Sequence, residues 1–239
     1  AVCRVLEDLN GGLQSHQIRG IAVDGTSSSL LVCDRNGNPL APALMYDDTR
    51  ARAFVRRIEE NAPPDTAVHA ASSSLAKALY LLSHAKYDRQ AVHLLHQSDW
   101  ILGRLSGRYG VSDENNALKL GYDALRRRWP QWVSDCGVHV GLLPEVYRPG
   151  SDPGNLTGAV ARQLGLSPET RILTGTTDST AAALAAGISK TGQAVTSLGS
   201  TLVVKVLSER PVFAADYGVY SHRLGDMWLV GGASNTGGA

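Results

Sequence analysis

Two spacings of hydrophobic residues divide the start of the chain into a helical part and a β-rich part. Residues 2–9 place apolar side chains at helical intervals, and a pair of glycines follows them. The segments 18–25 and 28–34 are rich in aliphatic residues and flank a Gly-Thr-Ser turn, while Asn-Gly at 36–37 predicts a reversal into a third strand. The pattern therefore predicts an amphipathic helix followed by a small antiparallel meander.

Helical spacing dominates the middle of the chain, and strands return after a Gly- and Pro-containing connection at 151–160. A buried type of strand at 171–178 then leads into a helix rich in small residues. We place a domain boundary near 164–171, which gives an N-terminal domain at 1–168 and the start of a second domain at 169–239. The helices are predicted at 49–61, 72–88, 98–107, 156–167 and 179–189, and the later strands at 194–207, 218–225 and 227–235.

Composition narrows the class of protein. The chain has 239 residues, of which 43% are hydrophobic, enough for a real core. Its 23 basic and 22 acidic residues are scattered, which argues against nucleic acid or a membrane surface as a partner. Cys3, Cys33 and Cys136 lack the spacing of a disulfide framework or a zinc site, and neither a leader nor a membrane span is apparent. We expect a soluble protein of the cytoplasm, with the plastid stroma as the alternative.

The segment SDENNALKLGYD, residues 112–123, admits two interpretations. In the structural one, Ser112 or Asp113 caps the first turn of a helix, with the two asparagines filling that turn. In the functional one, Asp113 is a carboxylate that takes a proton during a reaction. Asp123, at the far end, is interpreted as an ordinary helix-end residue.

Two later motifs together suggest a nucleotide crevice. In TGTTDS, residues 174–179, an acid ends a strand and hydroxyl residues open a helix, so free amides and a carboxylate are presented together. In TSLGST, residues 196–201, a glycine sits in a turn whose amides and hydroxyls can bind phosphate oxygens. Each motif alone is common in turns that bind nothing.

These motifs, in this order, resemble the FGGY family of carbohydrate kinases. The segments NNALKLGYD, GTTDS, AVTSLGST and GGASNTGGA look most similar to the plant and cyanobacterial branch, which includes xylulose kinase-like proteins and D-ribulose kinase. The resemblance covers almost the whole chain but about half of a family member. It implies an α/β protein with the ribonuclease H-like, actin-like ATPase fold, whose first domain lacks its N-terminal strands and whose second domain lacks its end. VDGTSSS at 23–29 imitates the family's first phosphate loop, but we interpret it as the sugar-side hairpin.

The resemblance also implies roles for individual residues. Asp113 falls on the general base that accepts the proton of the sugar hydroxyl. Asp48, in YDDTR, falls on an acid near the sugar, although a loop-capping role for it is almost as good. The implied sugar contacts are Asp24, Thr26, Ser27, Ser28, Asp48 and Asn116. The implied nucleotide contacts are Gly175, Thr176, Asp178, Gly199, Ser200 and Thr201, with Asp178 also contacting Mg²⁺.

The implied activity is transfer of a phosphoryl group from ATP, with Mg²⁺, to a small ketose, D-ribulose or D-xylulose, without turnover by this shortened chain alone. The alternatives are a catalytically silent sugar- or nucleotide-binding protein and an actin-fold hydrolase. The spacing of His93 and His96 could place both on one helix face, but without a third ligand we predict no metal there. Lys119 is interpreted as a solvated lysine, and the four tryptophans as packing residues.

Overall fold

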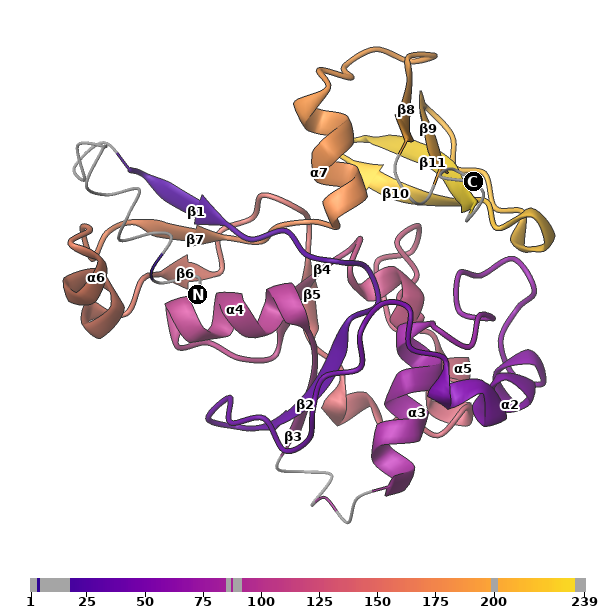
Figure 1. Ribbon diagram of the computed structural model, residues 1–239, viewed down its shortest axis with the longest axis horizontal. Helices are drawn as coiled ribbons and strands as arrows, with labels where there is room; N and C mark the ends of the chain where they lie inside the picture. Colours follow the sequence, from indigo (N-terminus) through magenta and orange to yellow (C-terminus); the bar gives the residue numbers. More distant parts are fainter. Residues whose placement is uncertain (1–3, 5–17, 85–86, 88–91, 199–201, 235–239) are drawn as a thin grey trace.

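The computed structural model describes residues 18–84, 92–198 and 202–234, together with Arg4 and Tyr87. Figure 1 shows a mixed α/β molecule with a larger body and, above it, a smaller C-terminal unit coloured orange to yellow. Apart from Arg4, the helix predicted at residues 2–9 lies outside the described residues. Among the described helices, none has the length and apolar character needed to cross a membrane.

The first strand pairs with a strand far along the chain. β1 (Gly20–Ala22) is parallel to β7 (Arg171–Leu173), which is antiparallel to β6 (Gly154–Asn155). The predicted meander is therefore wrong at its first step, because β1 does not pair with the strand that follows it. The parallel pairing aligns Ile21 with Ile172, and both side chains join an apolar cluster with residues of two helices.

The second predicted strand pairs with a strand that follows helix α3 (Ser74–His84) in the sequence. β2 (Leu30–Asp34) is antiparallel to β3 (Val92–His96). The predicted reversal does form after β2, since the Asp34 carboxylate accepts the amides of Asn36 and Asn38. The predicted third strand is reduced to two isolated bridges, at 30/44 and 33/39, because prolines at 39 and 42 interrupt the ladder.

Two segments for which a helix was considered, those around His93 and Asp113, are strands in the structure. His93 and His96 lie on β3, so their side chains point to opposite faces and do not share a helix face. β4 (Val111–Asp113) is parallel to β5 (Glu145–Tyr147), and a short 3₁₀ helix, η3 (Ala117–Leu120), follows. The stretch 112–123 is thus the end of a strand, a tight turn and a short 3₁₀ helix.

The predicted helices of the middle region are confirmed. α3 packs its apolar face into the main core beside β2 and β3, where Leu30, Leu75 and Leu94 are fully buried. Thr157 caps the start of α6, and Gly165 ends it in the left-handed conformation. The elements that match the predictions are η2 (Arg50–Phe54), α2 (Val55–Glu59), α3 (Ser74–His84), α4 (Gln97–Ser106) and α6 (Gly158–Leu164). The structure adds two short helices that were not predicted, α5 (Gln131–Asp135) and η4 (Val140–Leu142).

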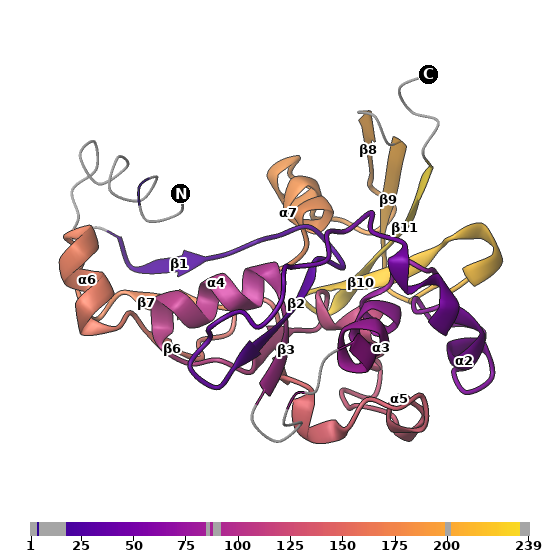
Figure 2. The same cartoon turned by 60° about the horizontal axis from the view of Figure 1, so that its bottom comes forward.

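The C-terminal unit, residues 178–234, is a helix packed on a four-stranded antiparallel sheet, as Figure 2 shows from a second side. Leu207 and Leu229 of the sheet pack with Ala183 of the helix. The elements are α7 (Asp178–Ala185), β8 (Ala194–Leu198), β9 (Leu202–Ser208), η5 (Ala215–Tyr217), β10 (Tyr220–Leu224) and β11 (Met227–Ser234), with sheet order β10-β11-β9-β8. The strand β7 belongs to the sheet of the larger body, and the division of the chain into domains near 164–171 stays a prediction.

Candidate functional site

The turn that follows β1 and the start of α7 are joined by backbone hydrogen bonds. The amide of Gly25 donates to the carbonyl of Thr176 at 3.3 Å, and the amide of Asp178 donates to the carbonyl of Gly25 at 2.9 Å. A Cβ on Gly175 would lie 1.7 Å from the carbonyl oxygen of Val23, so only glycine permits this approach. The turn predicted to face the sugar therefore adjoins the turn predicted to face the nucleotide.

The sugar-side turn holds four of the predicted contacts. Asp24 is exposed at its start, and the hydroxyls of Thr26 and Ser29 share a hydrogen bond of 2.5 Å. Ser28 has a φ of 69°, a left-handed conformation that is uncommon for serine. The hydroxyls of Ser27 and Ser28 are buried and have no hydrogen-bond partner among the described residues. Unpaired hydroxyl groups in such a turn are suited to a polar ligand or water.

A fully buried lysine ties this turn to the next loop. The Nζ of Lys77 donates to the carbonyls of Ser28 at 2.8 Å, Met45 at 2.6 Å and Tyr46 at 3.2 Å. Burial lowers the pKa of Lys77 to about 8, while the charge of Asp48 raises it. Sequence reasoning missed Lys77, although a lysine inside the apolar spacing of a predicted helix was a usable signal.

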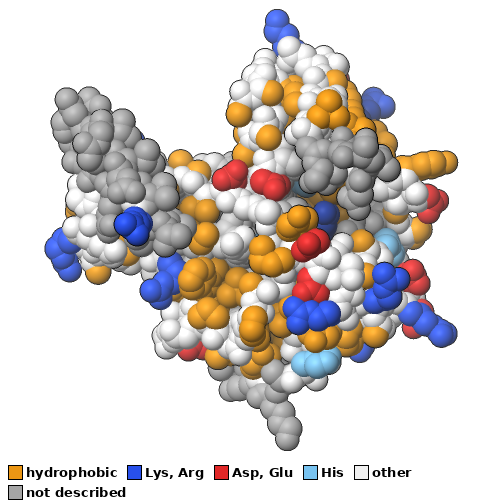
Figure 3. Space-filling view, in the orientation of Figure 1, with side chains coloured by type: hydrophobic (Ala, Val, Ile, Leu, Met, Phe, Trp, Pro, Cys, Tyr) orange, Lys and Arg blue, Asp and Glu red, His pale blue; other side chains and the backbone are white. Residues whose placement is uncertain are grey.

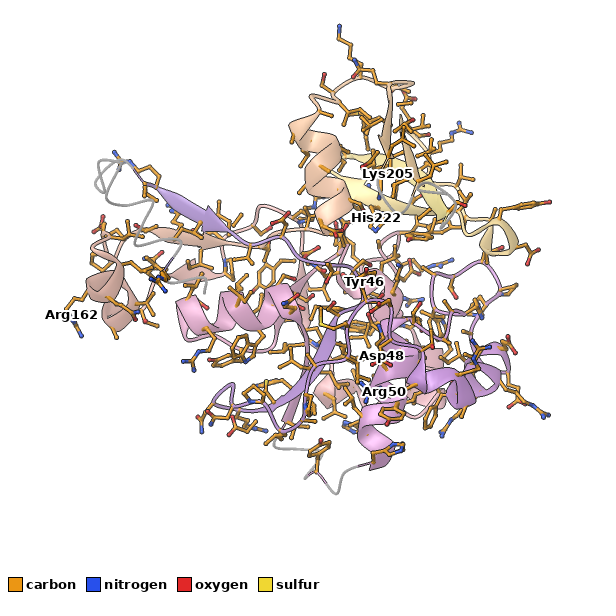
Figure 4. The ribbon with its side chains drawn as sticks, in the orientation of Figure 1. Tyr46, Asp48, Arg50, Arg162, Lys205 and His222 are labelled. Atoms are coloured by element: carbon orange, nitrogen blue, oxygen red, sulfur yellow. The ribbon has the colours of Figure 1, made fainter. Side chains whose placement is uncertain are left out.

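Asp48 caps its own loop. Its carboxylate accepts the backbone amide of Arg50 at 3.0 Å and pairs with the Arg50 guanidinium, and these hydrogen bonds lower the pKa of Asp48. Figure 4 shows Tyr46, Asp48 and Arg50 in a row along this segment, with Tyr46 nearest the C-terminal unit. The geometry favours the capping interpretation of Asp48, and its contact to a sugar stays a prediction.

Asp113 is enclosed by its own turn. The side chain is 2% exposed, Oδ1 accepts the amides of Asn115 at 2.9 Å and Asn116 at 3.0 Å, and Oδ2 accepts Nδ2 of Asn116 at 2.6 Å. Burial, and then the charge of Asp99, raise the pKa of Asp113 to about 7, although these hydrogen bonds act to lower it. The carboxylate thus caps the turn, as the structural interpretation of the motif expects, and has no open side toward a substrate in this conformation.

The pH dependence of stability tests this description of Asp113. At pH 4 to 7 the folded protein keeps the acid protonated, whereas the unfolded chain ionises it near 3.8. The folded state then binds more protons, so the contribution of Asp113 to the free energy of unfolding falls as pH rises through this window. We expect Asp113→Asn to remove that fall, by up to about 1.4 kcal/mol per pH unit, in urea unfolding at several pH values.

The exposed acid Asp65 offers the control for that measurement, because Asp65→Asn changes a carboxylate outside the core. We expect its profile to follow the wild type. An Asp113→Asn profile parallel to the wild type between pH 4 and 7 would contradict the raised pKa.

Asn115 links this turn to the C-terminal unit. Its Nδ2 donates to Oγ1 of Thr176 and to the carbonyl of Arg223, both at 2.9 Å, and its Oδ1 accepts the amide of Arg223 at 2.7 Å. The side chain is 1% exposed, so these bonds are shielded from water. Nδ2 of Asn116 donates to Asp113, whereas Oδ1 of Asn116 has no partner among the described residues, and its contact to a sugar stays a prediction.

A cavity of about 270 Å³ lies between the start of α7 and the sheet beside it. Asp178 and Ser179 line it from the helix, and Ser197 and Lys205 line it from the sheet. Asp178 is exposed, whereas Lys205 is buried and its Nζ lies 3.0 Å from Nδ1 of His222. Figure 3 shows acidic side chains along the border between the C-terminal unit and the larger body. Sequence reasoning missed Lys205 and His222, although a lysine alternating with Val203 and Leu207 on one face was a signal.

The remaining candidates are the other predicted phosphate contacts, a buried Ser-His-Asp chain and any cluster of metal ligands. Gly199, Ser200 and Thr201 lie outside the described residues. Ser74, His96 and Asp99 form a hydrogen-bonded chain, but all three are buried and Asp99 caps α4, so this arrangement is structural. Among the residues that the structure describes, no three His, Cys, Asp or Glu side chains gather as metal ligands would.

Comparison with known families decides the class of this protein. The family model for the N-terminal domain of the FGGY family of carbohydrate kinases matches residues 1–185. The chain belongs to the FGGY family. FGGY kinases use ATP, and their structures share the actin-like ATPase fold, which this mixed α/β chain matches over their N-terminal half.

Individual FGGY relatives give the extent of the match. The xylulose kinase of Streptomyces rubiginosus is 30% identical over 222 residues, which are 88% of this chain and 44% of that protein. The ligand-bound xylulose kinase from Lactobacillus acidophilus superposes with a TM-score of 0.86 at 17% identity, over 100% of this chain and 50% of that one. The glycerol kinase of Plasmodium falciparum with ADP gives 0.82 at 18% identity, over 97% and 50%. The chain thus spans about half the length of the relatives it matches.

Proposed function

We propose that this chain supplies the sugar-binding region and the first part of the nucleotide-binding region of an ATP-dependent ketose kinase, with D-ribulose or D-xylulose as the substrate. The observation that carries the proposal is the backbone pairing of Gly25 with Thr176 and Asp178. It brings the hydroxyl-rich turn at 24–29 next to the start of α7. A phosphoryl transfer needs this juxtaposition, because most of its catalysis is positioning of the two substrates.

Within this proposal, Asp178 is the acid best placed to take the proton of the attacking hydroxyl. It is exposed at the cavity and follows directly from the turn beside Gly25. Asp113, to which the sequence motif assigns that role, has both carboxylate oxygens engaged within its turn. We therefore propose that Asp113 and Asn115 position the turn that meets Thr176, and that Asp178 meets the sugar hydroxyl.

The donor groups at the cavity fit a magnesium ion that arrives with ATP. Mg²⁺ in such sites is bound by one or two carboxylates together with substrate phosphates, and Asp178 is the carboxylate that lines this cavity. When bound, the ion would neutralise charge on the phosphates. Gly175 and Thr176 shape the same turn, and contacts from Gly199, Ser200 and Thr201 to phosphate remain part of the proposal.

The test is sugar-dependent ADP release by the protein expressed from the full reading frame, with ATP and Mg²⁺. The panel contains D-ribulose, D-xylulose, other ketoses and glycerol. We expect one of the two pentuloses to stimulate release most, and the 239-residue chain alone to give little turnover. Binding of a sugar without ADP release would favour the catalytically silent binding protein. ADP release at the same rate with and without every sugar would favour a hydrolase.

A further inference from the structure

We propose that Lys205, held in place by His222, binds a phosphate group at the cavity beside α7. The inference rests on the proposed function only for the source of the phosphate, which is either the nucleotide or a phosphorylated sugar. Neither residue belongs to the motifs that identify the family.

The sheet register brings the two side chains together. Lys205 on β9 is aligned with Gly231 on β11, which is aligned with Tyr220 on β10. Because glycine has no side chain, the stem of Lys205 can cross β11 and reach His222, two residues beyond Tyr220 on the same face. Figure 4 shows Lys205 and His222 adjacent to one another in the C-terminal unit, and the register places both on the sheet face where Leu207 and Leu229 pack against α7.

The pair has hydrogen-bond donors without acceptors. Nδ1 of His222 lies 3.0 Å from Nζ of Lys205 and must accept from the ammonium group, so the ring proton of a neutral His222 is on Nε2. That Nε2 is buried and has no partner in the described part of the chain. Lys205 is 5% exposed and forms no ion pair with a described acid within 4.0 Å. A buried ammonium group is costly unless an anion accompanies it.

A second lysine approaches from the larger body. The Nζ of Lys119 lies 5.0 Å from the ring centroid of Tyr220, and that ring lies 5.3 Å from the ring of His222. Lys119 lines a separate cavity beside Tyr220, and burial together with the charges of Lys205 and Lys119 lowers the pKa of His222. The ring therefore stays neutral, Lys205 carries the positive charge at the cavity beside α7, and Asp178 is the acid that lines that cavity. A phosphate group, with up to two charges and three acceptor oxygens, could accept hydrogen bonds from Lys205 and from the hydroxyl of Ser197 on the same wall of the cavity.

The experiment uses inorganic phosphate as the probe and the 239-residue chain as the protein. Calorimetric titration and the phosphate-induced rise in melting temperature are measured for the wild type, Lys205→Met and His222→Leu. Lys190→Met, an exposed lysine of the same unit, is the matched control. Because losing a hydrogen bond to a charged group weakens binding by about tenfold or more, we expect that loss in Lys205→Met, a smaller loss in His222→Leu and none in Lys190→Met.

The melting temperature without phosphate shows whether a variant has lost phosphate binding or has failed to fold. Removing a buried charge often leaves a protein as stable or more stable, so we expect Lys205→Met without phosphate to melt no lower than the wild type. Wild-type chain that shows no phosphate binding at millimolar concentration, or Lys205→Met that binds as tightly as wild type, would overturn the proposal.

Two further titrations identify the source of the phosphate. ADP and D-ribulose 5-phosphate are each titrated into wild type and Lys205→Met, and the ligand with the greater loss is the one whose phosphate Lys205 contacts. The outcome is independent of the kinase assay. If phosphate binding depends on Lys205 but no sugar stimulates ADP release, the phosphate site stands and the proposed kinase function fails.

Discussion

Asp178→Asn is expected to lower sugar-dependent ADP release by about a hundredfold to ten-thousandfold in the protein of the full reading frame, the usual effect of losing a proton acceptor. The side chain is exposed at the cavity, so the change from carboxylate to amide should leave the melting temperature within a few degrees of the wild type. The measurements are initial rates of ADP release and a thermal melt of the same preparation.

Asp113→Asn and Asp216→Asn are the comparison variants. Asp216 is an exposed acid of the same unit, and its substitution should leave the rate unchanged. Asp113→Asn should alter the pH profile of stability while keeping a rate within about tenfold of the wild type, since Asn can still accept the amides of the turn. If Asp113→Asn abolishes release and Asp178→Asn does not, the base is the acid that the sequence motif names, and the turn must open during the reaction.

Gly175→Ala is expected to destabilise the chain by more than about 4 kcal/mol, at the upper end of single substitutions. The new Cβ would lie 1.7 Å from the carbonyl oxygen of Val23. Neither atom can move away by a side-chain rotation, because the Cβ is fixed to the backbone and the oxygen belongs to it. The junction must then separate, with loss of the hydrogen bonds that Gly25 makes to Thr176 and Asp178. Urea unfolding measures the change.

Gly158→Ala is the matched substitution, because the nearest atom to its added Cβ is 3.6 Å away and the position is the first residue of α6. Alanine is preferred to glycine in a helix by about 0.5–1 kcal/mol, so this variant should be equally or more stable. A Gly175→Ala protein with wild-type stability would show that β1 and β7 can move apart at no cost.

Local patterns in the sequence were sufficient to locate those helices and turns whose formation depends mainly on their own residues. Helical spacing located α3, α4, α6 and α7, and the Asn-Gly reversal after β2 formed as predicted. The strands of the C-terminal unit were also located, although the predicted strand at 194–207 is divided into the antiparallel pair β8 and β9.

Strand pairing over long distances could not be read from spacing. β1 has three residues, and nothing in them distinguishes the neighbouring β2 from the distant β7 as a partner. The choice depends on burying Ile21 and Ile172 with two helices, a tertiary effect. Apolar alternation around His93 also suited a helix or a strand, and a run of five residues is too short to separate them.

For the candidate site as well, short motifs located some residues, whereas features that depend on tertiary packing could not be predicted. Motifs assigned Asp24 to the sugar side and Thr176 and Asp178 to the nucleotide side, and in the structure Gly25, next to Asp24, forms hydrogen bonds to both Thr176 and Asp178. They could not show that Asp113 is enclosed, because burial depends on residues packed around the turn. Lys77, Lys205 and His222 belong to no short motif, and their partners are far along the chain or on a neighbouring strand.

The pairing of β1 with β7 also bears on how the protein is made. Gly20 and Arg171 are separated by most of the chain, so the turn at 24–29 can acquire its final shape only after α7 has begun to emerge from the ribosome. Contacts between residues so distant in sequence are slow to form, because a long loop must close first. During synthesis β1 is therefore an unpaired edge, and chaperones that shield exposed strands are expected to engage the nascent protein before the junction of the turn with α7 has formed.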